Sequence, residues 1–283
     1  MFQRIAVLGT GLIGGSFALA LRRHLGNVPV VGWDKPDVLS LARERGAITE
    51  SARDFATALR GADLVYLALP VGLTLEILPA IARQADPDAL VTDACSTKVA
   101  ICRAAAASFH DGARFLGGHP MAGREVSGIE SADAELFRGS KYVLIARVDD
   151  PDPHVQNFAV LLRRIAAEPI WLDADTHDWA VAIVSHLPQL VSLALAGVVH
   201  NETDETGLPI SLGGGGLRDM LRLAGSPYDI WRDICLTNTD NIARALDRVV
   251  QGLEHLRVRL ASRELRDEFT IANEVYKILR DLK

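Results

Sequence analysis

The first 172 residues alternate short apolar runs with longer segments in which apolar residues recur at helical spacing. The apolar runs predict strands at 5–8, 28–32, 64–69, 89–93, 114–117, 142–147 and 170–172. The segments between them predict helices from 17 onward and at 38–45, 52–59, 73–85, 99–108 and 155–167. Strands that are apolar almost throughout and alternate with helices are typical of a parallel sheet covered on both faces. We therefore expect an α/β domain that binds ligands beyond the carboxyl ends of its strands.

The pattern changes after Asp175, beyond which no further strand is predicted. Helices are expected at 176–200, 217–224, 227–236 and across most of 239–283. The first of these should bend at Pro188, because proline removes one helical hydrogen bond. We therefore predict an α/β domain at residues 1–173 and an all-helical domain at residues 174–283.

The predicted helical domain is rich in alanine and leucine and carries an apolar stripe near its end. The stripe consists of Ile242, Leu246, Val249, Val250, Leu253, Leu256 and Leu260. An exposed stripe of this kind favours association, so we expect a homodimer formed through this domain, with a monomeric bundle as the alternative. The longest apolar stretch, 180–199, is interrupted by polar residues and by Pro188. We interpret it as a buried helix rather than a membrane span.

A G-x-G-x-x-G motif joins the first predicted strand to the first helix. Gly9 allows a tight turn, Gly11 lets a pyrophosphate approach the backbone, and Gly14 lets the helix pack on the strand. The second strand ends at Asp34, 20 residues beyond Gly14, where an acid can bind a ribose 2′-OH. An ordinary strand–helix turn is the alternative. The predicted cofactor-binding residues are Gly9, Thr10, Gly11, Leu12, Ile13, Gly14, Asp34 and Pro70.

Asp34 favours NAD⁺ over NADP⁺, because a carboxylate repels a 2′-phosphate. Lys35 follows directly and keeps NADP⁺ as an alternative.

Composition narrows the class of protein further. The chain has 283 residues, of which 49% are hydrophobic and 23% charged, as in an ordinary soluble globular protein. Its net charge of −6 argues against a nucleic-acid-binding protein. The three cysteines, Cys95, Cys102 and Cys235, have no metal-binding spacing and fit a reducing compartment. We therefore expect a cytoplasmic protein with no metal site and no nucleic-acid or membrane partner.

Four polar clusters fall where chemistry is expected. They occupy 93–98 and 117–125 after strand ends, 185–189 within the long apolar helix, and 213–222 in the helical half. Three of the four have a simpler interpretation. His186 fits a buried histidine bonded to a backbone carbonyl, Ser96 fits a helix N-cap, and Arg218 with Arg222 fits a solvated helix face.

These clusters resemble the prephenate/arogenate dehydrogenase family over essentially the whole chain. The shared motifs are G-T-G-L-I-G-G-S, the Asp-x-x-Ser-x-Lys turn, H-P-M-A-G, S-H-L-P, and G-G-G-L-R-D-x-x-R-x-A followed by Trp231. The resemblance implies a Rossmann-type dinucleotide-binding domain followed by an all-helical dimerisation domain. It also implies an oxidative decarboxylation that leads to tyrosine, with transfer of a hydride to NAD(P)⁺.

The resemblance assigns roles to individual residues. His119 matches the catalytic histidine that bonds the substrate's ring hydroxyl, and Ser96 matches the serine that orients it beside the nicotinamide. The positions that match substrate-binding residues are His186, Arg222, Glu125, Arg218, Gln189 and Trp231. Gln189 departs from the family's frequent histidine, and Arg124 follows H-P-M-A-G where the family varies. The preference between prephenate and arogenate therefore stays open.

Two other functions fit parts of the pattern. A β-hydroxyacid dehydrogenase would need a lysine in its helical domain, yet no lysine lies between Asp175 and Tyr276. A non-catalytic dinucleotide-binding sensor would keep the glycine motif, but it would not need His119, Ser96, His186 and Arg222 together.

Overall fold

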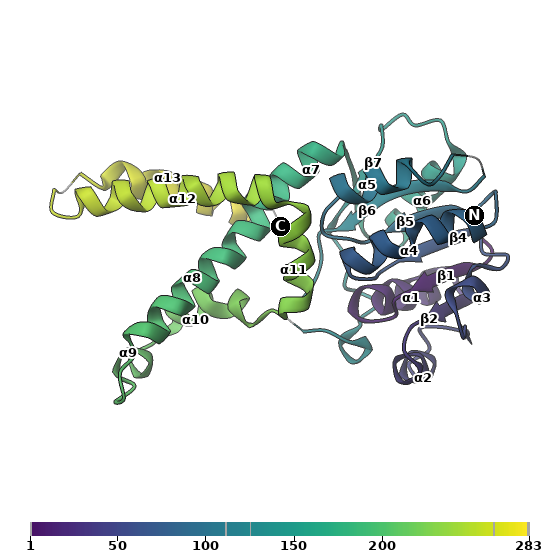
Figure 1. The fold of residues 1–283 in the computed structure, drawn as a ribbon, viewed down its shortest axis with the longest axis horizontal. Coiled ribbons are helices and arrows are strands. Elements are labelled where there is room, and N and C mark those ends of the chain that lie inside the picture. The colour runs from purple at the N-terminus through teal and green to yellow at the C-terminus, as the bar shows by residue number, and fades with distance from the viewer. Residues whose placement is uncertain (1, 111, 125, 263, 282–283) are drawn as a thin grey trace. The chain divides into compact units, whose positions relative to one another are not determined.

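The computed structural model describes residues 2–110, 112–124, 126–262 and 264–281 (Figure 1). The chain divides into two compact units, residues 1–239 and residues 240–283. The predicted boundary near residue 173 falls inside the first unit. As a division between functional domains it stays a prediction.

Within the described residues, eight strands form one sheet in the order β3-β2-β1-β4-β5-β6-β7-β8. The strands are β1 (Ile5–Leu8), β2 (Val30–Trp33), β3 (Glu50–Ser51), β4 (Leu64–Leu67), β5 (Leu90–Asp93), β6 (Arg114–Pro120), β7 (Lys141–Ile145) and β8 (Glu168–Leu172). The first six strands are parallel, as predicted, in the order expected of a dinucleotide-binding sheet. The two-residue strand β3 is not predicted by the apolar pattern, because both of its residues are exposed.

The prediction of a fully parallel sheet is wrong at β7, which runs antiparallel to β6 and parallel to β8. Among the described residues between β6 and β7, the one helical element is a short 3₁₀ turn, η1 (Ile129–Ser131). A parallel neighbour requires a crossover, usually a helix, whereas a returning loop places the next strand antiparallel. The described parts of the loop, residues 121–124 and 126–140, therefore stay at the end of the sheet where β6 finishes.

Helices cover both faces of the sheet. On one face lie α1 (Leu12–Leu25), α2 (Pro36–Glu44) and α6 (Pro153–Arg164), and on the other lie α3 (Phe55–Leu59), α4 (Val71–Gln84) and α5 (Val99–Ala106). Alternate strand residues enter opposite cores, so Ile5 and Val7 face the first layer and Ala6 and Leu8 the second. This explains why the strands are apolar throughout.

The long apolar segment after β8 is not one bent helix. It consists of α7 (Ala174–Val181), a π-helical turn η2 (Ala182–His186) and α8 (Leu187–Glu202). Pro188 lies in the first turn of α8, where a missing N–H is tolerated, so the irregularity precedes the proline instead of lying at it. π-Helical turns occur frequently at functional sites, and this one ends at His186.

The remaining helices of the first unit are short. They are α9 (Leu208–Ser211), α10 (Gly215–Leu221), the 3₁₀ turn η3 (Arg222–Gly225) and α11 (Tyr228–Thr237). Asp233 on α11 accepts a hydrogen bond from the Gly72 amide at the start of α4, at 2.8 Å. Thr237 and Thr97 share a hydrogen bond of 2.7 Å. These contacts hold α11 against the ends of the strands that form the predicted site.

The prediction that the long apolar stretch at 180–199 is buried is wrong, because much of its surface is exposed within the chain. By length and composition, the 174–202 segment is apolar enough to cross a membrane, and 28% of its most apolar window is buried within the chain. Val184, Leu193 and Val198 are exposed. One such helix is weak evidence for a membrane span, because an exposed apolar face is equally typical of a protein–protein interface.

The second unit is a helical hairpin of α12 (Thr239–Arg259) and α13 (Arg266–Asp281), as the helical spacing predicts. Glu268 on α13 accepts from His255 and Arg259 on α12, at 2.8 and 3.2 Å. The apolar stripe is largely exposed, including Val250 and Leu253.

Candidate active site

The glycine turn is shaped by two contacts that admit no side chain. Gly9 has φ +88°, and a Cβ there would lie 2.3 Å from the Ala68 carbonyl oxygen. A Cβ on Gly14 would lie 1.8 Å from the Gly9 carbonyl oxygen. By contrast, a Cβ on Gly11 would meet no atom within 4 Å. Gly9 and Gly14 therefore form the turn, while Gly11 leaves open space above it.

A cavity of about 340 Å³ opens over this turn. It is lined in part by Gly11, Leu12, Ile13, Pro70 and Ser96. The N-terminus of α1 begins here without a side-chain cap and without an acidic residue in its first turn, so its free amides suit a phosphate. These residues fit a dinucleotide: the α1 amides and Gly11 would hold its pyrophosphate.

Asp34 directly follows β2 beside the glycine turn, and its carboxylate already accepts hydrogen bonds from the chain. Its Oδ2 accepts from the Thr10 amide at 2.6 Å, and its Oδ1 accepts from the Lys35 amide at 2.7 Å. Each carboxylate oxygen can accept more than one hydrogen bond. Asp34 therefore holds the glycine turn in place and retains acceptor capacity for a ribose hydroxyl.

A second cavity, of about 540 Å³, lies between the strand ends and the helices that follow α7. The predicted residues that line it are Ser96, His119, His186, Gln189, Arg222 and Trp231. Ser96 and Arg124 border both cavities, so a ligand in one would lie next to a ligand in the other. Arg124 is also paired with Asp133 at 2.8 Å.

One predicted substrate-binding residue is not brought to this cavity by the structure. Arg218 is exposed on α10 and is not part of the cavity lining, although Arg222, four residues later, is. Glu125 lies outside the described residues.

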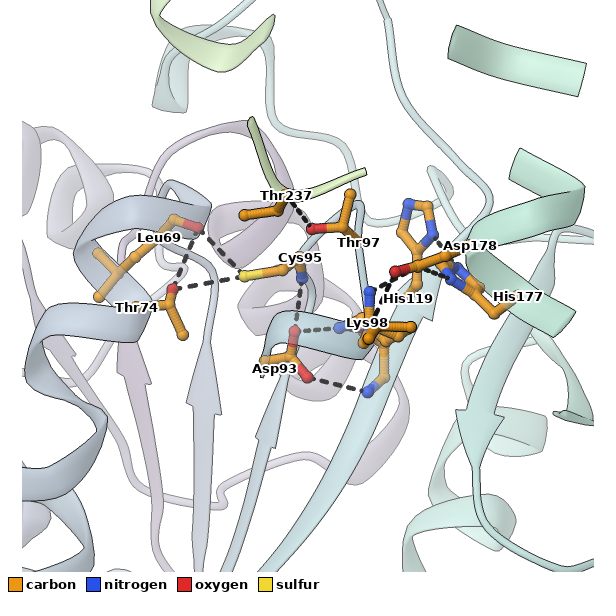
Figure 2. Close-up of polar contacts among 12 residues, drawn as sticks. Leu69, Thr74, Asp93, Cys95, Thr97, Lys98, His119, His177, Asp178 and Thr237 are labelled. Atoms are coloured by element: carbon orange, nitrogen blue, oxygen red, sulfur yellow. Dashed lines mark hydrogen bonds and ion pairs between the residues drawn. The ribbon is translucent and has the colours of Figure 1, made fainter. Parts of the chain in front are cut away.

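His119, at the end of β6, contacts a second histidine that the sequence analysis did not select. The Nδ1 atom of His119 lies 2.8 Å from Nε2 of His177. Nδ1 of His177 in turn lies 2.8 Å from Oδ1 of Asp178. Figure 2 shows these three side chains in a row from β6 to α7.

Asp178 also caps α5. It accepts from the Lys98 amide at 2.7 Å and from the Val99 amide at 2.9 Å. The interpretation of Ser96 as the N-cap of this helix is therefore wrong, because Asp178, from a distant part of the chain, fills that role. Ser96 is left to line the two cavities.

A fully buried ion pair between Asp93 and Lys98 lies beneath the site (Figure 2). Asp93 accepts from the amides of Cys95 and Gly118, at 2.9 and 3.0 Å, and Lys98 donates to the Gly118 carbonyl at 2.7 Å. The turn that carries Ser96 is thereby joined to the strand position directly before His119.

Both cavity histidines are pushed toward their neutral form. Burial lowers the pKa of His119 well below its usual value, and the nearby basic side chains of His177, Lys98 and His186 act in the same direction. Burial lowers the pKa of His186 to about 4, although Asp178 opposes the shift. At neutral pH, His119 is therefore free to accept a proton.

His186 contacts a side chain where a backbone carbonyl was the alternative expectation. Its Nδ1 lies 3.3 Å from the Asn238 amide nitrogen, and its ring meets Trp231 edge-on at 5.8 Å between centroids. Nδ1 therefore acts as the acceptor. The proton of neutral His186 is on Nε2, which can donate to a ligand.

Gln189 is buried, and its Oε1 has no hydrogen-bond partner among the residues that the structure describes. Buried polar atoms are nearly always paired. An unpaired acceptor in a residue that lines a cavity suits a donor on a ligand.

The sequence signals for these residues differ in strength. Asp93 and Lys98 belong to the Asp-x-x-Ser-x-Lys turn, but the motif alone does not reveal their pairing. His177 and Asp178 carry no local signal, because they lie in the first two turns of a predicted helix, where polar residues are common. Only the fold brings them within reach of His119 and α5.

Family models match both parts of the chain. Residues 17–170 match the model described as prephenate dehydrogenase, nucleotide-binding domain. Residues 173–272 match the model described as prephenate dehydrogenase, dimerization domain.

Curated relatives align along most of the chain. A prephenate dehydrogenase of Lactococcus lactis subsp. cremoris is 32% identical over 93% of this chain and 72% of its own length. A cyclohexadienyl dehydrogenase of Zymomonas mobilis is 30% identical over 93% of this chain and 90% of its own length.

Solved structures show the same architecture. A prephenate dehydrogenase from Aquifex aeolicus, in complex with hydroxyphenyl propionate and NAD⁺, superposes with a TM-score of 0.90 at 28% identity, covering 100% of this chain and 99% of that one. An arogenate dehydrogenase from Synechocystis has a TM-score of 0.80 at 28% identity, covering 99% and 100%. A 3-hydroxyisobutyrate dehydrogenase from Mycobacterium tuberculosis, at 16% identity and TM-score 0.54, shares the fold alone, over 81% of this chain and 74% of that one. The models of the two prephenate dehydrogenase domains match both halves of the chain. This protein therefore belongs to the prephenate dehydrogenase family.

Proposed function

We propose that this protein is an NAD⁺-dependent cyclohexadienyl dehydrogenase that oxidises and decarboxylates both arogenate and prephenate, with a preference for arogenate. The observation that carries the proposal is the meeting of the two cavities at Ser96, with the neutral base His119 on the wall of the substrate cavity. A substrate hydroxyl at His119 would then lie next to a nicotinamide in the neighbouring cavity.

The substrates are cyclohexadienes with a carboxylate on a quaternary carbon and a hydroxyl on the opposite ring carbon. NAD⁺, when bound, accepts the hydride from the hydroxyl-bearing carbon. His119 takes the hydroxyl proton as the carbon–oxygen double bond forms. When the carboxylate leaves as CO₂, the electrons of the broken C–C bond move through the ring to the oxygen. The oxygen recovers its proton from His119, and the product is an aromatic phenol.

The other cavity residues bind and orient the substrate. Arg222 supplies a guanidinium that can hold a carboxylate through two parallel hydrogen bonds. His186 supplies a neutral hydrogen-bond donor. Trp231 packs edge-on against the imidazole of His186 and holds that imidazole in place. Ser96, between the two cavities, orients the hydroxyl toward His119.

The preference for arogenate rests on Gln189. Arogenate carries an ammonium where prephenate carries a keto oxygen, and an ammonium left unpaired in a closed site is costly. The unpaired Oε1 of Gln189 is an acceptor that suits this ammonium, whereas a keto oxygen cannot donate to it. Glu125 is proposed to add a negative charge at the mouth of the site.

We also propose that the protein acts as a homodimer through its helical segments. The exposed apolar residues of η2 and α8, including Val184 and Val198, form a surface that favours association. The family model that matches residues 173–272 is described as a dimerization domain.

Turnover of the purified protein tests the proposal directly. We expect NADH and CO₂ to form from both substrates, with a higher kcat/KM for arogenate. We also expect a higher kcat/KM with NAD⁺ than with NADP⁺, because Asp34 repels a 2′-phosphate. Absence of turnover with either substrate would overturn the function, and a higher kcat/KM with NADP⁺ would overturn the assignment of Asp34.

The pH dependence of kcat tests the base. A base must be neutral to accept a proton, and the pKa of His119 is lowered. The rate should therefore stay on its plateau through the ordinary histidine value of about 6.5 and fall only at lower pH. His119→Asn should lower kcat by roughly 10²–10⁴-fold with NAD⁺ affinity unchanged. An acidic limb at or above the ordinary value, or a wild-type kcat in the variant, would assign the base elsewhere.

Arg222 and Arg218 form a matched pair, because they lie one turn apart and only Arg222 lines the cavity. Arg222→Ala should raise KM by about tenfold or more with kcat largely kept, since a charged hydrogen bond is lost equally from ground and transition states. Arg218→Ala should leave KM within about twofold of the wild-type value, within the range of exposed substitutions. A fall in kcat at unchanged KM would place Arg222 in the chemical step.

Gln189→Met tests the substrate preference, because methionine has a similar length but cannot accept a hydrogen bond from an ammonium with comparable strength. We expect the arogenate kcat/KM to fall by about tenfold, with a smaller change for prephenate. Glu125→Gln should likewise cost arogenate more than prephenate. Equal losses for the two substrates would show that neither residue recognises the ammonium.

A further inference from the structure

His177 and Asp178 lie behind His119, outside the cavity that His119 lines. We propose that they are positioning residues that hold His119 in the tautomer whose Nε2 carries no proton and faces the substrate. This inference rests on the proposed function, because it explains how His119 is kept ready to act as the base.

The donor and acceptor of each hydrogen bond can be assigned by starting at Asp178 and moving to His177 and then to His119. Both carboxylate oxygens of Asp178 accept from backbone amides, those of Lys98 and Val99. The carboxylate is an acceptor toward every partner, so the bond to His177 is donated by the Nδ1–H of His177. In neutral His177 the other nitrogen, Nε2, then carries no proton and must accept.

The next link extends the same logic to His119. Because Nε2 of His177 accepts, the 2.8 Å contact is donated by the Nδ1–H of His119. Neutral imidazole carries one ring proton, so Nε2 of His119 is left with a lone pair. Nδ1 is engaged behind the ring, and Nε2 is the nitrogen that remains for the cavity.

We call the hydrogen-bonded side chains of His119, His177 and Asp178 the row. Burial supports the assignment of a single charge to this row, that of the Asp178 carboxylate. His177 and Asp178 are almost completely inaccessible to solvent, and isolated buried charges are costly. The charged groups around them are the Asp93–Lys98 pair and Asp178 itself, whose charge is stabilised by two amides at the start of α5. Asp178 is also fixed by its position on α7, so the row has one rigid end.

The row also prepares His119 for the charge that it acquires. When the substrate hydroxyl proton moves to Nε2, the positive imidazolium still donates Nδ1–H to His177, and His177 still donates to Asp178. The developing charge thus meets an acceptor already in place, and no group has to reorient. The proton returns from Nε2 to the oxygen during decarboxylation, so the row ends unchanged.

Two substitutions of His177 separate the two contacts that it makes. His177→Asn keeps a polar group near the position of Nδ1, which preserves the Asp178 contact but cannot reach His119. His177→Gln places its amide oxygen near the position of Nε2, where it can accept from His119. We expect kcat to fall by about 10²-fold in His177→Asn and by less than about tenfold in His177→Gln, within the range seen for general-base catalysis.

KM for each substrate should change by less than about twofold in both variants, because His177 does not line the cavity. The affinity for NAD⁺ and the melting temperature serve as checks that each variant is folded. Equal losses of kcat in the two variants, or a wild-type kcat in His177→Asn, would overturn the inference.

The tautomer of His119 can be measured in a separate experiment that does not depend on enzyme activity. In ¹⁵N-histidine NMR spectra of the ligand-free protein near neutral pH, the His119 signals are identified by their loss in His119→Asn. We expect a protonated Nδ1 and an unprotonated Nε2. A proton on Nε2 would overturn the inference even in an active enzyme, whereas the expected tautomer in a protein inactive on both substrates would overturn only the proposed function.

Discussion

The arrangement of this site depends on the buried ion pair between Asp93 and Lys98. Both side chains are fully inaccessible to solvent, so each requires the other, and removal of one would leave an uncompensated buried charge at a cost of roughly 3–5 kcal/mol. The pair also satisfies three backbone groups, the Cys95 amide and both polar groups of Gly118. The turn with Ser96 and the strand with His119 are therefore joined at a fixed distance before any ligand is present.

The same ion pair influences the chemistry of the neighbouring histidines. The Lys98 charge adds to burial in lowering the pKa of His119. An interior that holds a cation resists a second one, so His119, the proposed base, stays neutral near neutral pH. Asp178 has the opposite effect and raises the pKa of His186 against the dominant effect of burial. The site thus contains the buried Asp93–Lys98 ion pair and the Asp178 carboxylate, which accepts from amides at the start of α5. These charges surround the neutral imidazoles of His119 and His186.

Most of the fold could be predicted from the sequence, because its signals are local. The apolar runs locate the sheet from β1 to β8 apart from the exposed strand β3, and the glycine spacing describes the turn that Gly9 and Gly14 form. The antiparallel β7 could not be predicted, because strand direction depends on the path of the loop after β6. The π-helical turn before Pro188 was also missed, since the periodicity of the apolar residues hardly changes across it.

For the site, the motifs in the sequence contain six residues that line the cavity, namely Ser96, His119, His186, Gln189, Arg222 and Trp231. The motifs do not include His177 and Asp178, and 58 positions separate His119 from His177 along the chain. The motif that contains Arg222 also contains Arg218, but only Arg222, at the start of η3, lines the cavity, whereas Arg218 lies on α10.

The helix α8 joins substrate binding to the outer surface of the protein. Its inner face carries Gln189 and Ser192, both buried, and Ser192 accepts from the Ala224 amide that follows Arg222 on η3. Its outer face carries the exposed side chains of Leu193 and Val198. In the proposed homodimer, covering this outer face would remove apolar surface from water and restrict the motion of α8. Because Gln189 and η3 are both attached to that helix, association would stabilise the substrate cavity as well as the assembly.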